Sequence, residues 1–465
     1  MSSIREWSAA AVGEIDGVRW WLGPGVEPAR AQPLLARALA ALADAEALES
    51  PGPKGLYRLA LAGAKPDFLL KVRRYGRRGA WPGRLRTGRA RRELALASAL
   101  ARREVAVAVP LAAGERRRAG LLRACYLLVP IVDGAEDLAR LWRAGEVASR
   151  ERRAWATALG RLARRLHELG LDQADFAPNN FLVLRGEPPR LLPVDFERAR
   201  LRGRLGARAR GRMLADLDGR LEGCGAATRL RLLVAYSGGE RAAARRQWRR
   251  AELEAARLAA RELDHLRRAG TRESRRFQPF ASGGWRGWAR RDTALLGLVA
   301  RDLAADTERR PSASAAPRIE ACGALWRWSA SGVGPREARR VWAAAQLLWQ
   351  RGGLTPLPLA LARRFGEAQL WLARDPAVRR LDELAGVAPA RWAAVVLIDR
   401  LLALGRLAPR LDARSVALAA APGGRWRAVL LDPSAWRPGR PVRRERRARA
   451  RRLVGDLLAR RSPAG

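Results

Sequence analysis

Residues 171–197, LDQADFAPNNFLVLRGEPPRLLPVDFE, restrict the possible fold of this chain more than any other segment. An aspartate, Asp175, stands five residues before an asparagine, Asn180, and two short apolar runs follow. The second run ends in another aspartate and a phenylalanine, Asp195 and Phe196. Aspartate and asparagine at this fixed spacing are typical of a loop that performs chemistry beside short strands.

The composition strengthens this interpretation, because asparagine occurs only at Asn179 and Asn180. Lysine occurs only at Lys54, Lys65 and Lys71, so nearly all of the 90 basic residues are arginine. Lysine, asparagine and isoleucine have AT-rich codons, and their scarcity indicates a very GC-rich gene that drifts away from them. Where such residues persist, something other than drift retains them.

Length and charge limit the class of protein. A chain of 465 residues is too long for one ordinary core, so two or three domains are expected. The formal net charge of +44 favours polyanions such as anionic lipid head groups, a phosphorylated glycolipid or nucleic acid. The alternative is a solvated, arginine-loaded surface without a specific partner.

Rare residue types exclude further classes. Three widely spaced cysteines give neither a disulfide framework nor a zinc spacing, which fits a reducing compartment. Two histidines give little support to a histidine metal site or to a Ser-His-Asp hydrolase; we expect His167 to be a packing residue and Cys125 to lie in a core strand. Neither a signal peptide nor an apolar run of about 18 residues is evident, so no membrane span is expected.

The order of the expected elements indicates two lobes. Apolar alternation predicts a strand hairpin over 56–75 that carries Lys71, followed by a helix over 86–103 that carries Glu93. Two more strands are expected before residue 134, and a strong amphipathic helix over 151–170 leads into the opening segment. A sheet-rich lobe therefore precedes a mostly helical one.

The pattern then recurs within the same chain. Residues 89–112 align without gaps with a later segment, which places Arg92 on Arg340 and Pro110 on Pro358. The opening segment likewise aligns from Gly405 onward, and Asp195 falls on Asp432. An internal repeat of this length predicts a tandem duplication of one fold.

The second copy lacks the polar residues of the first. Val341 replaces Glu93, Arg410 replaces Asp175, and Ser415 replaces Asn180, while no lysine follows Lys71. Apolar and glycine positions persist. This is the pattern expected of a copy that keeps its fold and loses its reaction.

Phosphoryl transfer from a nucleotide requires a cation on the phosphates, oxygen ligands for a metal, and an acceptor for the proton of the attacking hydroxyl. We assign the phosphate contact to Lys71, its support to Glu93, and the proton acceptor to Asp175. Asn180 and Asp195 are the expected Mg²⁺ ligands.

Simpler explanations remain at this stage. Lys71 could be a solvated strand-end residue, as Lys54 and Lys65 are expected to be, and Glu93 a solvated helix residue. Asp175 and Asn180 could form a turn, and Asp195 could cap one. Asp172, three residues before Asp175, is a rival for the base.

The first half of the chain resembles the lipopolysaccharide core kinase family, bacterial kinases of the protein-kinase-like fold that phosphorylate Kdo or heptose. The segments that carry the likeness are FLLKVRRYG, RARRELALASAL, YLLVPIVDGAEDL, LHELGLDQADFAPNNFLVL and LLPVDFERAR. The resemblance implies a two-lobed α+β fold, ATP with Mg²⁺, and a sugar hydroxyl of a membrane glycolipid as acceptor. Lys71, Glu93, Asp175, Asn180 and Asp195 each match the family pattern.

Three departures from kinase patterns stand out. Gln173 replaces the usual histidine before the catalytic aspartate, which could loosen the packing beneath the loop. The turn expected to cover the phosphates is PGPKG, residues 51–55, rather than a Gly-x-Gly-x-x-Gly loop. Glu197 stands where protein kinases have the glycine after Asp-Phe.

The sequence thus predicts an active kinase-like domain over 1–275, with a small lobe over about 1–130 and a helical lobe over about 131–275. A degenerate kinase-like domain is expected over 285–465. We expect a cytoplasmic protein bound peripherally to the anionic inner membrane face, without a specific nucleic acid partner. Alternatives are a small-molecule kinase of the aminoglycoside or choline type, a protein kinase, or a non-catalytic scaffold that binds membrane or nucleic acid.

Overall fold

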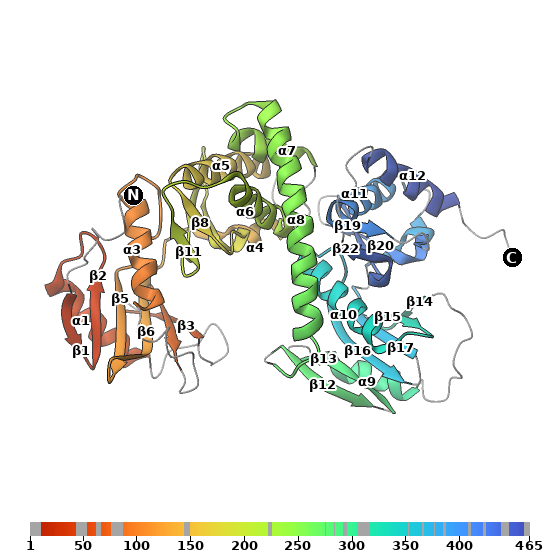
Figure 1. The fold of residues 1–465 in the computed structure, drawn as a ribbon, viewed down its shortest axis with the longest axis horizontal. Coiled ribbons are helices and arrows are strands. Elements are labelled where there is room, and N and C mark those ends of the chain that lie inside the picture. Colours follow the sequence, from red (N-terminus) through yellow and green to blue (C-terminus); the bar gives the residue numbers. More distant parts are fainter. Residues whose placement is uncertain are drawn as a thin grey trace. The chain divides into compact units, whose positions relative to one another are not determined.

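The computed structural model describes most of the chain: residues 11–42, 54–61, 67–75, 87–143, 149–221, 226–274, 276–282, 284–291, 295–305, 317–351, 353–364, 367–375, 377–384, 387–407, 411–421, 425–438 and 446–459. By their contacts, the residues fall into two compact units (Figure 1). The first comprises residues 1–141, 150–213 and 231–241, and the second 142–149, 214–230 and 242–465. The contacts thus group residues 242–275, which the sequence analysis assigned to the first domain, with the later residues.

The first unit contains a six-stranded antiparallel sheet of order β1-β2-β5-β6-β4-β3. Two helices accompany it, α1 (Pro28–Ala41) and α3 (Arg89–Ala101). The strands are β1 (Ala11–Ile15), β2 (Val18–Leu22), β3 (Lys54–Leu59), β4 (Phe68–Arg74), β5 (Ala112–Arg118) and β6 (Leu121–Pro130).

The alternation of side chains along β4 decides where Lys71 lies. Leu70 and Val72 are buried in the cluster that contains Leu35 of α1. The cluster on the other face contains Leu94 of α3 together with Leu127 of β6, which pairs with Lys71. Because successive strand residues point to opposite faces, Lys71 lies on the face that α3 covers.

The remainder of the first unit carries the opening segment. Helix α5 (Ser149–Glu168) ends before β8 (Leu171–Gln173), and the turn between them contains Gly170 with φ +83°. A Cβ at Gly170 would come within 1.7 Å of the Arg202 carbonyl oxygen, so only glycine fits there. The other elements are β7 (Ala135–Asp137), the 3₁₀ turn η2 (Pro178–Asn180), β9 (Phe181–Leu184), β10 (Arg190–Pro193) and β11 (Ala199–Leu201). Three helices, α4 (Leu138–Arg143), α6 (Ala207–Arg220) and α7 (Ala226–Tyr236), belong in part to the first unit and in part to the second.

The second unit contains another six-stranded sheet, of order β12-β13-β16-β17-β15-β14. Its strands are β12 (Phe277–Ser282), β13 (Trp285–Arg290), β14 (Arg318–Cys322), β15 (Leu325–Ala330), β16 (Pro358–Arg364) and β17 (Glu367–Ala373). The helices and turns are α8 (Arg241–Ala269), α9 (Leu296–Ala305), α10 (Pro335–Gln350), η4 (Leu381–Leu384), α11 (Ala388–Leu404), η5 (Ala413–Ser415), η6 (Pro433–Ala435) and α12 (Arg446–Ala459).

The two sheets have the same strand order when their strands are counted from the first of each set. The small sheets correspond as well: β10-β9-β7 and β11-β8 in the first set, and β18-β20-β21 and β19-β22 in the second. The remaining short strands are β18 (Arg379–Arg380), β19 (Gly405–Leu407), β20 (Val416–Ala421), β21 (Arg425–Leu430) and β22 (Trp436–Pro438). The predicted α+β class is confirmed, and among the described helices none combines the length and apolar character required to cross a membrane.

Candidate active site

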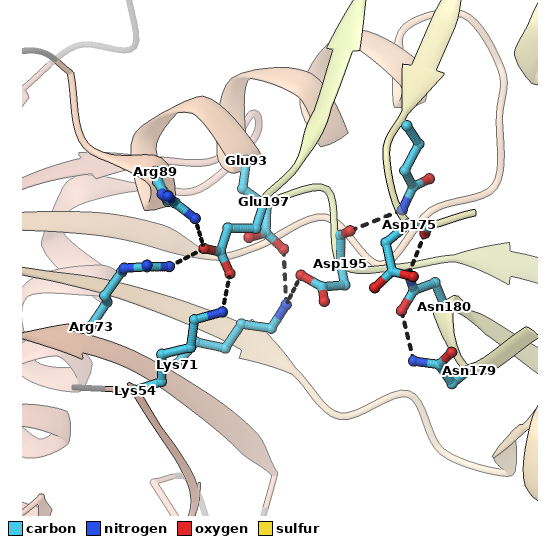
Figure 2. A network of polar contacts seen from close by, with 11 residues as sticks. Lys54, Lys71, Arg73, Arg89, Glu93, Asp175, Asn179, Asn180, Asp195 and Glu197 are labelled. Atoms are coloured by element: carbon cyan, nitrogen blue, oxygen red, sulfur yellow. Dashed lines mark hydrogen bonds and ion pairs between the residues drawn. The ribbon is translucent and has the colours of Figure 1, made fainter. Parts of the chain in front are cut away.

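Lys71 lies between two carboxylates. Its Nζ donates to Glu93 Oε1 at 2.9 Å and to Asp195 Oδ1 at 3.3 Å (Figure 2). Glu93 faces the strand from the second turn of α3 and is buried, with 6% of its surface exposed. The structure therefore brings together three of the five predicted site residues, although they come from distant parts of the sequence.

Electrostatics keep this lysine charged. Burial opposes the charge of Lys71, but the nearby Glu93 and Asp195 carboxylates raise the pKa above its ordinary value. Burial also raises the pKa of Glu93, while the positive charge of Lys71 lowers it in part. A protonated lysine supported by a buried glutamate is suited to contact nucleotide phosphates.

The other two predicted residues, Asp175 and Asn180, lie on one short loop around η2. The Asn180 side-chain amide donates to the Asp175 carbonyl oxygen at 2.7 Å, and Asn180 Oδ1 accepts from Asn179 Nδ2 at 3.2 Å. The Asn180 carbonyl accepts from Val194 N at 2.9 Å, next to Asp195. The loop and the aspartate turn are therefore joined through the backbone.

Asp195 has an unusual backbone conformation, with φ +59°. A non-glycine residue in the left-handed region is strained, and such strain is typical of functional sites. Gln173, which replaces the usual histidine, is 2% exposed and donates from Nε2 to the Asp195 carbonyl oxygen at 3.1 Å. The substitution therefore supplies a partly buried hydrogen bond to the Asp195 turn.

Asp172 lies in a different environment from Asp175. One of its oxygens accepts from Arg202 Nε at 2.7 Å, and the other accepts from Arg212 Nη2 at 2.6 Å. Two guanidinium groups thus occupy both oxygens of the Asp172 carboxylate. This geometry favours Asp175 over Asp172 as the proton acceptor.

The oxygens of Asn180 and Asp195 suit a hard cation. Within the described part of the chain, no cluster of three or more histidine, cysteine or acidic residues forms a complete metal cage. Magnesium in nucleotide sites requires no such cage, because it retains water and binds phosphate oxygens beside one or two protein ligands. Asn180 donates a hydrogen bond to the Asp175 carbonyl through its side-chain nitrogen, so its oxygen, Oδ1, is not used in that bond. Oδ1 accepts from Asn179 and has a second lone pair with which it can bind a cation.

An ion cluster that was not predicted from the sequence lines the same cleft. Lys54, Arg73 and Arg89 all contact the carboxylate of Glu197 (Figure 2). These residues line a cavity of about 200 Å³ together with Lys71, Glu93 and Asp195. The persistence of Lys54 in a lysine-poor chain was the available signal, whereas nothing distinguished the two arginines from the many others.

The loop rests on a small aromatic group. His167 is 1% exposed, its Nδ1 lies 2.9 Å from the Tyr236 hydroxyl, and its ring lies 5.4 Å from that of Phe176. Burial, with nearby Arg210, lowers the His167 pKa to about 3, so its ring is neutral near neutral pH. The predictions of a packing His167 and a core-strand Cys125 are confirmed.

Strand register identifies what stands in place of Lys71 in the second sheet. In the first sheet, Lys71 of β4 pairs with Leu127 of β6, which pairs with Ala113 of β5. In the second sheet, Trp328 of β15 pairs with Leu370 of β17, which pairs with Leu361 of β16. Extending the alignment of residues 89–112 by one residue places Ala113 on Leu361, so Trp328 occupies the position of Lys71.

Trp328 also replaces the contact of Lys71 with the aspartate. Its Nε1 donates to Asp432 Oδ1 at 2.9 Å, and it shares an apolar cluster with Val341. Asp432 has φ −104°, is 3% exposed, and also accepts from Ser434 N at 2.9 Å. Arg410, the expected counterpart of Asp175, lies outside the described residues.

One comparison with known protein families agrees with this chemistry. Residues 77–255 match the model of the lipopolysaccharide kinase (Kdo/WaaP) family, a range that includes Glu93, Asp175, Asn180 and Asp195. No curated protein matches the chain. One solved structure, WaaP in complex with acyl carrier protein, is 22% identical with a TM-score of 0.36, and the match covers 50% of this chain and 98% of that chain. Residues 77–255 are therefore similar to the lipopolysaccharide kinase (Kdo/WaaP) family, and the chain is a kinase.

Proposed function

We propose that this kinase transfers the γ-phosphate of ATP to a sugar hydroxyl of a lipopolysaccharide-core-type glycolipid at the cytoplasmic membrane face. The observation that carries the proposal is the contact of Lys71 with both Glu93 and Asp195 in one cleft. The acceptor class rests on the match of residues 77–255 to the family.

Each site residue has a separate task in this reaction. Lys71 binds the phosphates of the nucleotide, and Glu93 keeps its ammonium group oriented. Asp175 orients the acceptor hydroxyl and takes its proton as the oxygen attacks the γ-phosphorus. The bond from that phosphorus to the oxygen shared with the β-phosphate breaks, and ADP leaves.

Asn180 and Asp195 hold Mg²⁺ in this proposal. The ion, when bound, neutralises charge on the β- and γ-phosphate oxygens. The chain itself fixes the two ligands: Asn180 through its bond to the Asp175 carbonyl, and Asp195 through the bond from Gln173 to its backbone. Both ligands are therefore set before the nucleotide enters.

The second copy is a degenerate kinase-like domain that follows an active one, and its sheet begins at β12 (Phe277–Ser282), before the boundary at residue 285 that the sequence predicted. The repeated strand order and the equivalence of Trp328 with Lys71 support this duplication. A neutral indole brings no positive charge to phosphates, its N–H already donates to Asp432, and Trp328 is buried, with 1% of its surface exposed. The second copy thus keeps an aspartate, Asp432, as a structural hydrogen-bond acceptor.

Transfer of labelled phosphate tests the acceptor class. With γ-labelled ATP and Mg²⁺, we expect label on purified core glycolipid, and none on a free aminoglycoside or a general protein substrate. Labelling of the aminoglycoside or the protein instead would assign the chain to the small-molecule or protein kinases. The absence of any Mg·ATP binding by the wild type would favour the non-catalytic scaffold.

Binding to lipid vesicles tests the membrane proposal. Because its net charge is +44, the protein should bind vesicles that contain anionic lipid, and it should not bind neutral phosphatidylcholine vesicles. Salt screens exposed charges, with a Debye length of about 10 Å at 0.1 M that falls to about 3 Å at 1 M. We expect cosedimentation to fall steeply over this range, and binding that ignores both salt and lipid charge would contradict the proposal.

A further inference from the structure

One acidic side chain, Glu197, forms ion pairs with basic residues from three separate elements of the sheet-rich lobe. Lys54 Nζ, at the start of β3, lies 3.1 Å from Glu197 Oε2. Arg73 of β4 and Arg89, the first residue of α3, both contact Oε1 (Figure 2). The Glu197 side chain is 20% exposed, so these contacts are partly shielded from water.

The partners of Glu197 are close in the chain to the catalytic residues. Arg73 is two residues from Lys71 on β4, and alternate strand residues share a face. Arg89 is one helical turn before Glu93 on α3. Glu197 itself follows Asp195 by two residues. The cluster therefore links the three segments that present Lys71, Glu93 and Asp195.

We propose that Glu197 is a positioning residue, which holds β4 and α3 against the aspartate turn so that Lys71, Glu93 and Asp195 stay aligned. The inference rests on the proposed phosphoryl transfer. Glu197 touches neither substrate nor metal in this account, and it acts through its three cationic partners.

The geometry explains why one carboxylate matters to three segments. Lys54, Arg73 and Arg89 all lie against the Glu197 carboxylate. Without its negative charge, three positive charges would converge on one point and repel one another. Neutralising Glu197 should thus move β4 and α3 apart from the turn.

The second copy supplies an internal comparison. By alignment from Asp432, Ser434 stands in place of Glu197, and its Oγ contacts Asp432. By strand register, Ala330 stands in place of Arg73, two residues after Trp328. The ion cluster is lost together with the reactive residues, while the strand order persists. Folding alone therefore does not require Glu197.

A different role for Glu197 would be to occupy the space of a phosphate until nucleotide arrives. In that role, removing the negative charge of Glu197 would free its three cationic partners to bind the nucleotide. The Glu197→Gln variant would then bind ATP more tightly with an unchanged kcat. A positioning role predicts a lower kcat at a similar KM, since displaced groups fail in the transition state.

The test compares phosphate transfer from Mg·ATP to core glycolipid by the wild type with that by Glu197→Gln, Glu197→Asp and the control Glu168→Gln. Glu168 accepts from Arg164 at 2.7 Å on the exposed face of α5, so its substitution also removes an ion pair. We expect kcat to fall roughly tenfold to a hundredfold in Glu197→Gln, with KM for ATP within about threefold, because small misplacements cost this much. Glu197→Asp should recover part of the loss, and Glu168→Gln should match the wild type.

Hydrogen–deuterium exchange of the full chain without nucleotide provides a second, independent readout. Exchange of the α3 amides should rise in Glu197→Gln and not in Glu168→Gln. Wild-type kinetics with unchanged α3 exchange would overturn the inference, as would a lower KM at unchanged kcat. A wild type without transfer to core glycolipid would refute the proposed function, and the exchange result would still decide whether Glu197 holds α3.

Discussion

Asp175→Asn should lower phosphate transfer by roughly a hundredfold to ten-thousandfold while Mg·ATP still binds with nearly the wild-type Kd. An amide cannot take the proton of the acceptor hydroxyl, and general-base catalysis contributes about this much. The substitution preserves size, and the bond from Asn180 reaches the Asp175 backbone carbonyl rather than its side chain. Single-turnover transfer and a separate nucleotide titration measure the two quantities.

Asp172→Asn is the matched comparison for this variant. It makes the same chemical change three residues earlier, at the carboxylate that Arg202 and Arg212 hold. We expect some loss of thermal stability, because two guanidinium groups lose their charged partner. The rate of phosphate transfer, corrected for the fraction of folded protein, should stay within a few-fold of the wild-type rate. If Asp172→Asn abolished transfer and Asp175→Asn did not, the base would be Asp172.

The arrangement of the catalytic residues could be anticipated because their spacing follows the period of each element. Lys71 on a strand and Glu93 on the next helix face each other once the strand alternates and the helix covers one face. Asp175 and Asn180 are close in sequence, so one loop holds both. Their catalytic roles remain predictions.

The ion cluster and the position of Trp328 could not be derived in the same way. Arg73 and Arg89 belong to a chain whose basic residues are nearly all arginine, so neither carried a signal. Trp328 became the counterpart of Lys71 only through the pairing of β15 with β17. Strand register depends on contacts between strands that are distant in sequence, and a gapless sequence alignment contains no information on those contacts.

Asp195→Ala should abolish Mg²⁺-dependent nucleotide binding, whereas Asp432→Ala should leave it intact. The Asp195 side chain is 46% exposed, lies in the cleft and contacts Lys71, so its oxygens are available to a cation. Outer partners of metal ligands already contribute about 10–100-fold to metal affinity. Losing a ligand itself should cost at least as much. Titration of each variant with ATP, with and without Mg²⁺, measures this difference.

The same substitution at Asp432 should act on stability alone. Asp432 is buried and accepts from Trp328 Nε1 and from Ser434 N, and alanine would leave both donors without this acceptor. Each buried donor left unsatisfied costs about 1–3 kcal/mol, so the free energy of unfolding should fall by a few kcal/mol. Equal loss of Mg·ATP binding in both variants would mean that the second copy also binds nucleotide. A loss confined to Asp195→Ala would assign the two equivalent aspartates to different tasks, metal binding in the first copy and support of the fold in the second.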